Sequence, residues 1–167
     1  IVIIVFPLLS LSLDTESVLC IMVSWEDEMN KRITAEDIDR FTGWYIKAAL
    51  WSTSGDVESL DETHDENGLS TEAREKAERD CFDFLETHGD NILAAHDAVR
   101  YGRWNRLSPD TFGDAGYDFW MTRNGHGVGF WDGDWPDESN PDDMDVYCNR
   151  VGEVDPYVGD DNLIYGF

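Results

Sequence analysis

The sequence contains few basic residues. Only 12 lysines and arginines stand against 36 aspartates and glutamates, the formal net charge is −24, and the lysines are Lys31, Lys47 and Lys76 alone. Because a nucleic-acid binder neutralises phosphates with a basic surface, we expect no direct nucleic-acid binding. The negative charge of the chain also argues against binding to an anionic membrane surface, because the two would repel each other. With 41 % hydrophobic and 13 % aromatic residues, the chain is still able to build an ordinary core.

Cysteine is also scarce, and no internal repeat with a period of 20–50 residues is visible. The three cysteines, Cys20, Cys81 and Cys148, are far apart and form no C-x-x-C pair. This spacing predicts neither a zinc site nor a disulfide framework, and it favours a reducing cytoplasm. No motif indicates a cofactor, and we expect none.

The sequence also lacks an apolar run long enough to cross a bilayer, which takes about 20 residues. Its apolar start extends only to Leu13 and has no basic flank or small-residue cleavage site. Because the segment after Met22 is typical of a soluble amino terminus, we expect residues 1–21 to be an upstream extension. A truncated membrane anchor is the alternative. Residues 22–33 are then an amino-terminal arm and residues 34–167 a single domain.

Helical periodicity marks the first half of this domain. Thr34 with Asp37 is typical of a capping box, and apolar residues recur behind it at helical spacing. A second helix is predicted from residue 70 or 71 to 88, ended by Gly89, and a third from 90 or 91 to about 101. In the first helix Trp44 and Trp51 widen the apolar face, so we expect that helix to be buried on two sides.

The pattern changes in the second half. Residues 117–123 and 128–132 are strand-like and flank an Asn-Gly pair, which is a strong hairpin signal. A second hairpin is predicted from residues 154–158 and 163–165, with a short helix over about 142–151 between the two hairpins. Helices followed by antiparallel hairpins indicate an α+β fold. We expect about three helices packed on an antiparallel sheet built from the two hairpins.

The first predicted hairpin contains the sequence DFWMTRNGHGVGFWD, residues 118–132. It resembles the central motif of a family of small acidic proteins encoded by tailed bacteriophages and related viruses. The resemblance covers roughly residues 38–166, although that family usually has leucine where Met121 stands and a more basic helix at 142–151. It implies a viral or prophage origin and a shared fold. Because the family has no assigned activity, the resemblance transfers no catalytic residue.

The same hairpin supplies the candidate site. His126 is predicted at its tip between two glycines, where an imidazole suits acid–base chemistry; the alternative is an exposed turn histidine. Because no serine or cysteine nucleophile lies near it in the sequence, we favour binding over catalysis. The residues expected to bind a partner are Trp120, Arg123, His126, Trp131, Asp132 and Trp135.

Residues 132–138 imitate the start of a calcium loop. Asp132, Asp134 and Asp137 stand at the first, third and sixth positions of such a loop, but Pro136 stands at the fifth position and the required glycine at the sixth is absent. We therefore favour a solvated acidic loop over a dedicated metal site.

Three hypotheses on function follow. The first is a virus-encoded accessory protein that acts by binding in the host cytoplasm, its carboxylates imitating nucleic-acid phosphates in the basic groove of a host or viral protein. The second is an interaction or structural module that uses an aromatic patch around Trp120, Trp131 and Trp135, its acidity being an adaptation to a salty cytoplasm. The third is a small enzyme that uses His126.

Overall fold

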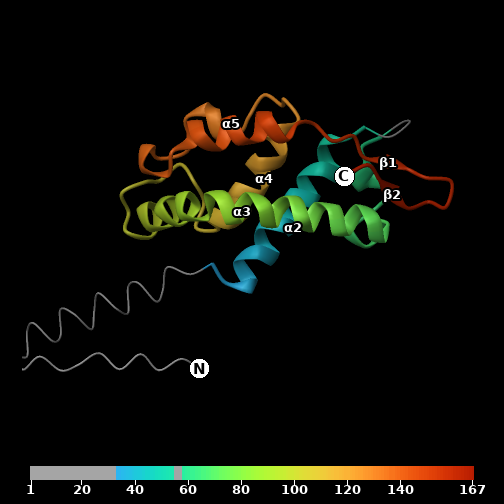
Figure 1. Cartoon of the computed structure of the whole chain (residues 1–167), viewed down its shortest axis with the longest axis horizontal. Helices are drawn as coiled ribbons and strands as arrows, with labels where there is room; N and C mark the ends of the chain where they lie inside the picture. Colours follow the sequence, from blue (N-terminus) through green and yellow to red (C-terminus); the bar gives the residue numbers. More distant parts are fainter. Residues whose placement is uncertain (1–32, 55–57) are drawn as a thin grey trace, which may run out of the picture. The chain divides into compact units, whose positions relative to one another are not determined.

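The computed structural model describes residues 33–54 and 58–167, and this part of the chain is mainly helical (Figure 1). The extension expected over residues 1–21, and all but the last residue of the expected arm, lie outside the described residues. The helices are α2 (Ala35–Ser52), α3 (Thr71–Arg100), α4 (Thr111–Arg123) and α5 (Pro141–Val151). Short 3₁₀ turns are η1 (Leu60–Glu62), η2 (Glu66–Gly68), η3 (Phe130–Asp132) and η4 (Asp137–Ser139).

The predicted α+β architecture is wrong. In the described part of the chain the strands are two-residue segments, β1 (Tyr157–Val158) and β2 (Ile164–Tyr165). They pair antiparallel with Tyr157 opposite Tyr165, which confirms the second predicted hairpin. A sheet this small has no face able to carry three helices, so the helices pack on one another instead.

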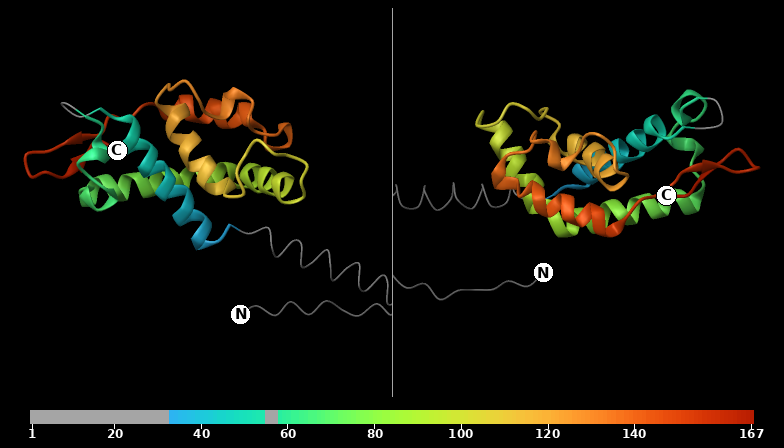
Figure 2. Two further views of the ribbon diagram at one scale, coloured as in Figure 1. Left: turned by 180° about the vertical axis from the view of Figure 1, so that it is seen from behind. Right: turned by 90° about the horizontal axis from the view of Figure 1, so that it is seen from above.

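Helix α4 is the central element, because it contacts α2, α3 and α5 (Figures 1 and 2). Its closest approach is to α2, where Gly116 lies against the backbone of Phe41. A Cβ at Gly116 would overlap the Phe41 carbonyl oxygen, so the two helices touch through their backbones. The predicted short helix before the second hairpin is confirmed as α5.

The amino end of α2 has the predicted capping box. The Thr34 hydroxyl accepts a hydrogen bond from the Asp37 N–H (3.2 Å), and the Asp37 carboxylate accepts one from the Thr34 N–H (2.9 Å). The expectation that α2 is buried on two sides is wrong, since the side chains of Trp44 and Trp51 are 42 % and 58 % exposed. One face of α2 therefore packs in the core while another presents two indoles to solvent.

Helix α3 continues through the position where the second helix was expected to end. Gly89 is buried within it, and a Cβ there would overlap the Cδ1 atom of Ile33. This glycine serves close packing rather than a helix terminus. The left-handed glycine that follows α3 is Gly102, with φ of 67°.

Residues 117–123, predicted as a strand, form the second half of α4. The helix begins after Asp110, whose carboxylate accepts a hydrogen bond from the Gly113 N–H (3.3 Å). A segment with apolar side chains on both faces fits a strand covered twice, but it fits equally a helix buried almost all round. Every residue from Phe119 to Arg123 is buried.

The Asn124-Gly125 pair, which predicts a hairpin turn, instead ends α4. Gly125 is left-handed, with φ of 66°, and its N–H donates to the Thr122 carbonyl (3.2 Å). The next N–H, of His126, donates to the Met121 carbonyl (3.0 Å). These two bonds form a Schellman motif. Asn-Gly supplies a left-handed residue in either setting, so the local signal does not separate a hairpin from a helix end.

One aromatic cluster joins the four helices. The ring of Phe84 on α3 is fully buried, and its centroid lies 4.5 Å from that of Phe119 on α4. It lies 5.4 Å from Phe41 on α2 and 5.4 Å from Tyr147 on α5. Such pairs contribute about 0.5–1.5 kcal/mol each beyond area burial. The cluster fixes where α2 and α4 lie, and these two helices carry the candidate site.

Candidate functional site

Most residues of the 118–132 motif make contacts inside the fold. Trp120 and Trp135 are 1 % and 2 % exposed, and the Trp120 Nε1–H donates to Ser52 Oγ (2.7 Å). Trp131, in contrast, is 54 % exposed. The structure therefore does not bring the three tryptophans together as a surface patch, and of these three Trp131 alone offers its ring to a partner.

Arg123 lies at the centre of a buried network. Its Nη1 donates to the Tyr45 hydroxyl (2.7 Å) and to the Asp80 carboxylate (2.8 Å), and its Nε donates to the Gly152 carbonyl (2.9 Å). Lys76 also pairs with Asp80. A buried charge persists when it is paired and hydrogen-bonded. Arg123 therefore links α2, α3, α4 and the end of α5, and its guanidinium is engaged within the fold.

His126 is half-buried at the end of α4. It lines a hollow of 400 Å³ together with Ser52, Glu153 and Asp155. The Ser52 hydroxyl donates to the Ala48 carbonyl (2.7 Å) and accepts from the indole of Trp120, so it is not poised as a nucleophile for His126. Acid–base chemistry at His126 stays a prediction.

The three aspartates of the predicted calcium-like loop lie in different surroundings. Asp132 accepts hydrogen bonds from the N–H groups of Gly129 (3.3 Å) and Asp134 (3.0 Å), while the carboxylate of Asp134 pairs with Arg106 (3.4 Å). Asp137 is exposed in the η4 turn. Within the part of the chain that the structure describes, no group of three or more His, Cys, Asp or Glu side chains is arranged to hold a metal ion.

A groove of 640 Å³ runs between α2, the 3₁₀ turns that follow it, and α4. Its wall carries Trp44, Lys47 and Trp51 from α2 and Tyr117 from α4, and we call it the aromatic groove. The ring centroids of Trp51 and Tyr117 lie 6.5 Å apart, and the Lys47 Nζ lies 5.0 Å from the centroid of Trp44. Acidic side chains of the turns border the groove: Asp61, Asp65 and Glu66.

A second hollow, of 360 Å³, adjoins the aromatic groove, because Trp44 and Tyr117 line both. It contains Asp118 of α4, whose carboxylate accepts a hydrogen bond from the Trp135 Nε1–H (2.7 Å). Trp44 packs on α4 at this junction, where a Cβ on Gly113 would lie 2.5 Å from its ring. We call this hollow the Asp118 pocket.

The carboxyl group of Asp118 has an unusual electrostatic environment. Burial raises its pKa to about 7, and the negative charges of nearby aspartates add to the rise. The hydrogen bond from Trp135 opposes it. Burial also raises the pKa of Asp114, a second carboxyl group that lines the pocket. A carboxyl group that titrates near neutrality in a hollow is a candidate for function, and a cation beside it would favour its ionised form.

The aromatic groove had a signal in the sequence. Trp44, Lys47 and Trp51 follow the i, i+3, i+7 spacing that places side chains on one face of a helix. The same spacing is typical of a core face, so the pattern alone does not separate the two. Tyr117, on the opposite wall, comes from a segment whose pattern predicts a strand.

None of the described helices is both long and apolar enough to cross a membrane. Comparisons of the chain with protein-family models, with curated proteins and with solved structures found no match. The family resemblance and the viral origin therefore stay predictions, and function is inferred from the geometry and charge of this chain.

Proposed function

We propose that this protein acts by binding, and that the aromatic groove and the Asp118 pocket hold a basic segment of a partner protein. The proposal is supported by the fact that the two hollows adjoin, since Trp44 and Tyr117 line both. A cation placed there lies against an indole face and close to carboxylates. It gains from the ring quadrupole and from the negative charges together.

The charge of the described residues supports a basic partner. They include 30 acidic and 10 basic residues. Six of the basic side chains already form ion pairs with acidic side chains: Arg40, Lys76, Arg79, Arg103, Arg106 and Arg123. The remaining surface carries a large excess of carboxylates. Such a surface attracts basic segments and repels both nucleic acid and a second copy of the chain.

Lys47 supports the view that the groove accepts a cation. Its ammonium lies over the ring of Trp44, which is the contact that a partner's basic side chain would make. The ring of Trp51, two turns beyond Trp44 on α2, is more exposed than that of Trp44. Because a planar guanidinium stacks on an indole better than an ammonium does, we expect arginine to be preferred over lysine.

The class of partner we propose is a host or viral protein that handles nucleic acid. Such proteins display the arginines and lysines that contact phosphates, and these side chains match the aromatic groove and its carboxylates. On this proposal the carboxylates take the place of phosphates, and the indoles add the affinity that diffuse charge does not give.

The test uses an acetylated and amidated hexa-arginine peptide, titrated at 0.15 M and 1 M salt by calorimetry. We expect Trp51→Ala to weaken binding about tenfold, as loss of a stacked cation predicts. Trp131→Ala is the matched control, because Trp131 is about as exposed as Trp51 but does not line the groove. Equal affinities of the two variants, with complete loss of binding at high salt, would show that only diffuse charge attracts the peptide.

A further inference from the structure

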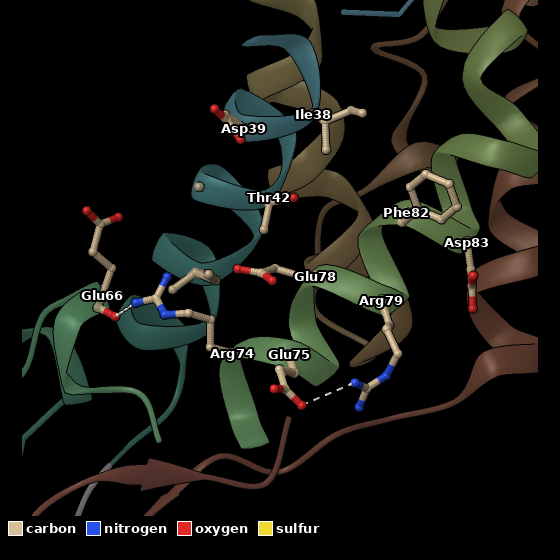
Figure 3. Close-up of a pocket in the computed structure, with 12 residues that line it drawn as sticks. Ile38, Asp39, Thr42, Glu66, Arg74, Glu75, Glu78, Arg79, Phe82 and Asp83 are labelled. Atoms are coloured by element: carbon tan, nitrogen blue, oxygen red, sulfur yellow. Dashed lines mark hydrogen bonds and ion pairs between the residues drawn. The ribbon is translucent and has the colours of Figure 1, made fainter. Parts of the chain in front are cut away.

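A separate groove lies on the other side of α2, between α2 and α3, with a volume of 750 Å³ (Figure 3). Figure 3 shows Ile38, Asp39 and Thr42 along α2, and Phe82 on α3. We call it the α2–α3 groove. It shares Glu66 with the aromatic groove but none of the four residues that form the aromatic wall.

The α2–α3 groove contains three large apolar side chains among charged ones, and one of the three is an exposed aromatic ring. Ile46 is buried at α2 and Ile38 is half-buried, while Phe82 on α3 is 52 % exposed. Removing the exposed half of this ring from water is favourable. A ligand that covers Phe82 therefore gains hydrophobic free energy that the described fold leaves unused.

Gly43 lines the same groove in the middle of α2, where glycine is unfavourable for a helix. A Cβ built on Gly43 would meet no atom within 4 Å among the described residues. Packing within this fold therefore does not require a glycine at that position, unlike at Gly116. A small residue on a groove-lining helix allows the backbone of an incoming segment to approach closely.

We propose that the α2–α3 groove is a second docking site, and that its occupant is an amphipathic helix of a partner protein with lysine or arginine beside its apolar face. The backbone groups of α2 and α3 are paired within their own helices. An incoming strand would therefore leave its backbone unpaired, whereas a helix satisfies its own. A groove flanked by two helices suits helix-in-groove recognition through residues at i, i+3, i+4 and i+7.

The charge of the groove selects a basic helix. Its acidic side chains outnumber its basic ones, and they are Asp39, Glu66, Glu75, Glu78 and Asp83. The two arginines are engaged: Arg74 donates to the Glu66 carbonyl, and Arg79 pairs with Glu75 at 3.7 Å. A second copy of the chain would bring further negative charge to this surface, which disfavours self-association.

The probe is a 14-residue amphipathic peptide with leucines on one face and lysines on the other, labelled for fluorescence anisotropy at 0.3 M salt. We expect Phe82→Ala and Gly43→Leu each to weaken its binding at least tenfold. Tyr101→Ala and Ala35→Leu are matched controls on α3's C-cap and on α2, since both residues are exposed and neither lines the groove. Thermal unfolding of each variant checks that the fold is intact.

Two of the variants, Trp51→Ala and Phe82→Ala, distinguish this groove from the aromatic groove. Trp51→Ala should leave binding of the leucine–lysine helix unchanged, and Phe82→Ala should leave binding of hexa-arginine unchanged. Equal affinities of the wild type and Phe82→Ala for the helix would overturn the α2–α3 site, and that outcome would not affect the aromatic groove. Gly43→Ala adds a further readout, because it should raise the melting temperature of the free protein while weakening the complex.

Discussion

Helix α4 carries two buried ionisable side chains whose surroundings differ. Arg123 donates three hydrogen bonds to Tyr45, Asp80 and Gly152, and one of these partners carries the opposite charge. Asp118, five residues earlier, accepts one hydrogen bond from a neutral indole and lies among other aspartates. The network around Arg123 keeps it charged, whereas burial pulls Asp118 toward its neutral form.

This difference distinguishes a structural residue from a candidate functional residue within the 118–132 motif. A buried charge with all its partners inside the protein fixes the packing of several elements. A buried carboxyl group with few partners costs stability when it ionises, and a cation from outside relieves that cost. We infer that Arg123 holds the fold together and that Asp118 is the residue poised to respond to a ligand.

The largest effect is expected from breaking the Arg123 network. Arg123→Met should lower the free energy of unfolding by about 3–5 kcal/mol, because it leaves buried polar groups without their charged partner. Urea unfolding measures this loss. Arg79→Met is the control, since Arg79 is exposed and its pair with Glu75 is worth little. If both variants lose the same small amount, Arg123 does not have the structural role assigned to it.

The next largest effect concerns Asp118 and pH. Its pKa is about 7 in the folded protein and roughly 3.9 when unfolded. Between these values the folded state holds a proton that the unfolded state has released, so this group's contribution to stability falls as pH rises from about 4 to 7. Asp118→Asn keeps an acceptor for Trp135 and removes this slope, and it should stabilise the protein by roughly 2–4 kcal/mol at pH 8.

Urea unfolding at a series of pH values measures that slope. Asp137→Asn, at an exposed carboxylate, should leave the pH profile of the wild type in place. Parallel profiles for the wild type and Asp118→Asn would mean that Asp118 titrates normally.

A smaller effect is expected from the hydrogen bond between Trp135 and Asp118. Trp135→Phe removes the one hydrogen bond that opposes the rise in the pKa of Asp118, so this pKa should increase above its wild-type value. Carboxyl carbon chemical shifts, followed by NMR through a pH titration, report it directly. An unchanged or lower pKa would mean that the indole N–H does not stabilise the carboxylate.

Part of this fold follows from local sequence signals. The capping box at Thr34, the start of α3 after Ser70, helix α5 and the last hairpin are all predicted, because each depends on neighbouring residues. Gly89 wrongly predicts a helix end, and the Asn124-Gly125 pair wrongly predicts a hairpin turn. Gly89 is set by contact with Ile33, distant in sequence, and Asn-Gly ends helices as well as forming hairpin turns.

The candidate site is harder to predict than the fold. His126 and the tryptophans of the motif are conspicuous, but burial of Trp120 and Trp135 depends on the helical conformation of α4. The pairing of Trp51 with Tyr117 joins residues from separate helices. No local pattern shows that Asp118 is buried beside an open groove, because its pKa depends on tertiary packing.

On the proposed function, a cation bound in the aromatic groove shifts Asp118 toward its ionised form. Calorimetric titration of hexa-arginine at pH 7, repeated in two buffers with different ionisation enthalpies, measures the protons released on binding. With the pKa near 7, about half of Asp118 is protonated, so the wild type should release up to about half a proton. Asp118→Asn should bind the peptide without this release. Equal proton release by the two proteins, or none by the wild type, would contradict the claim.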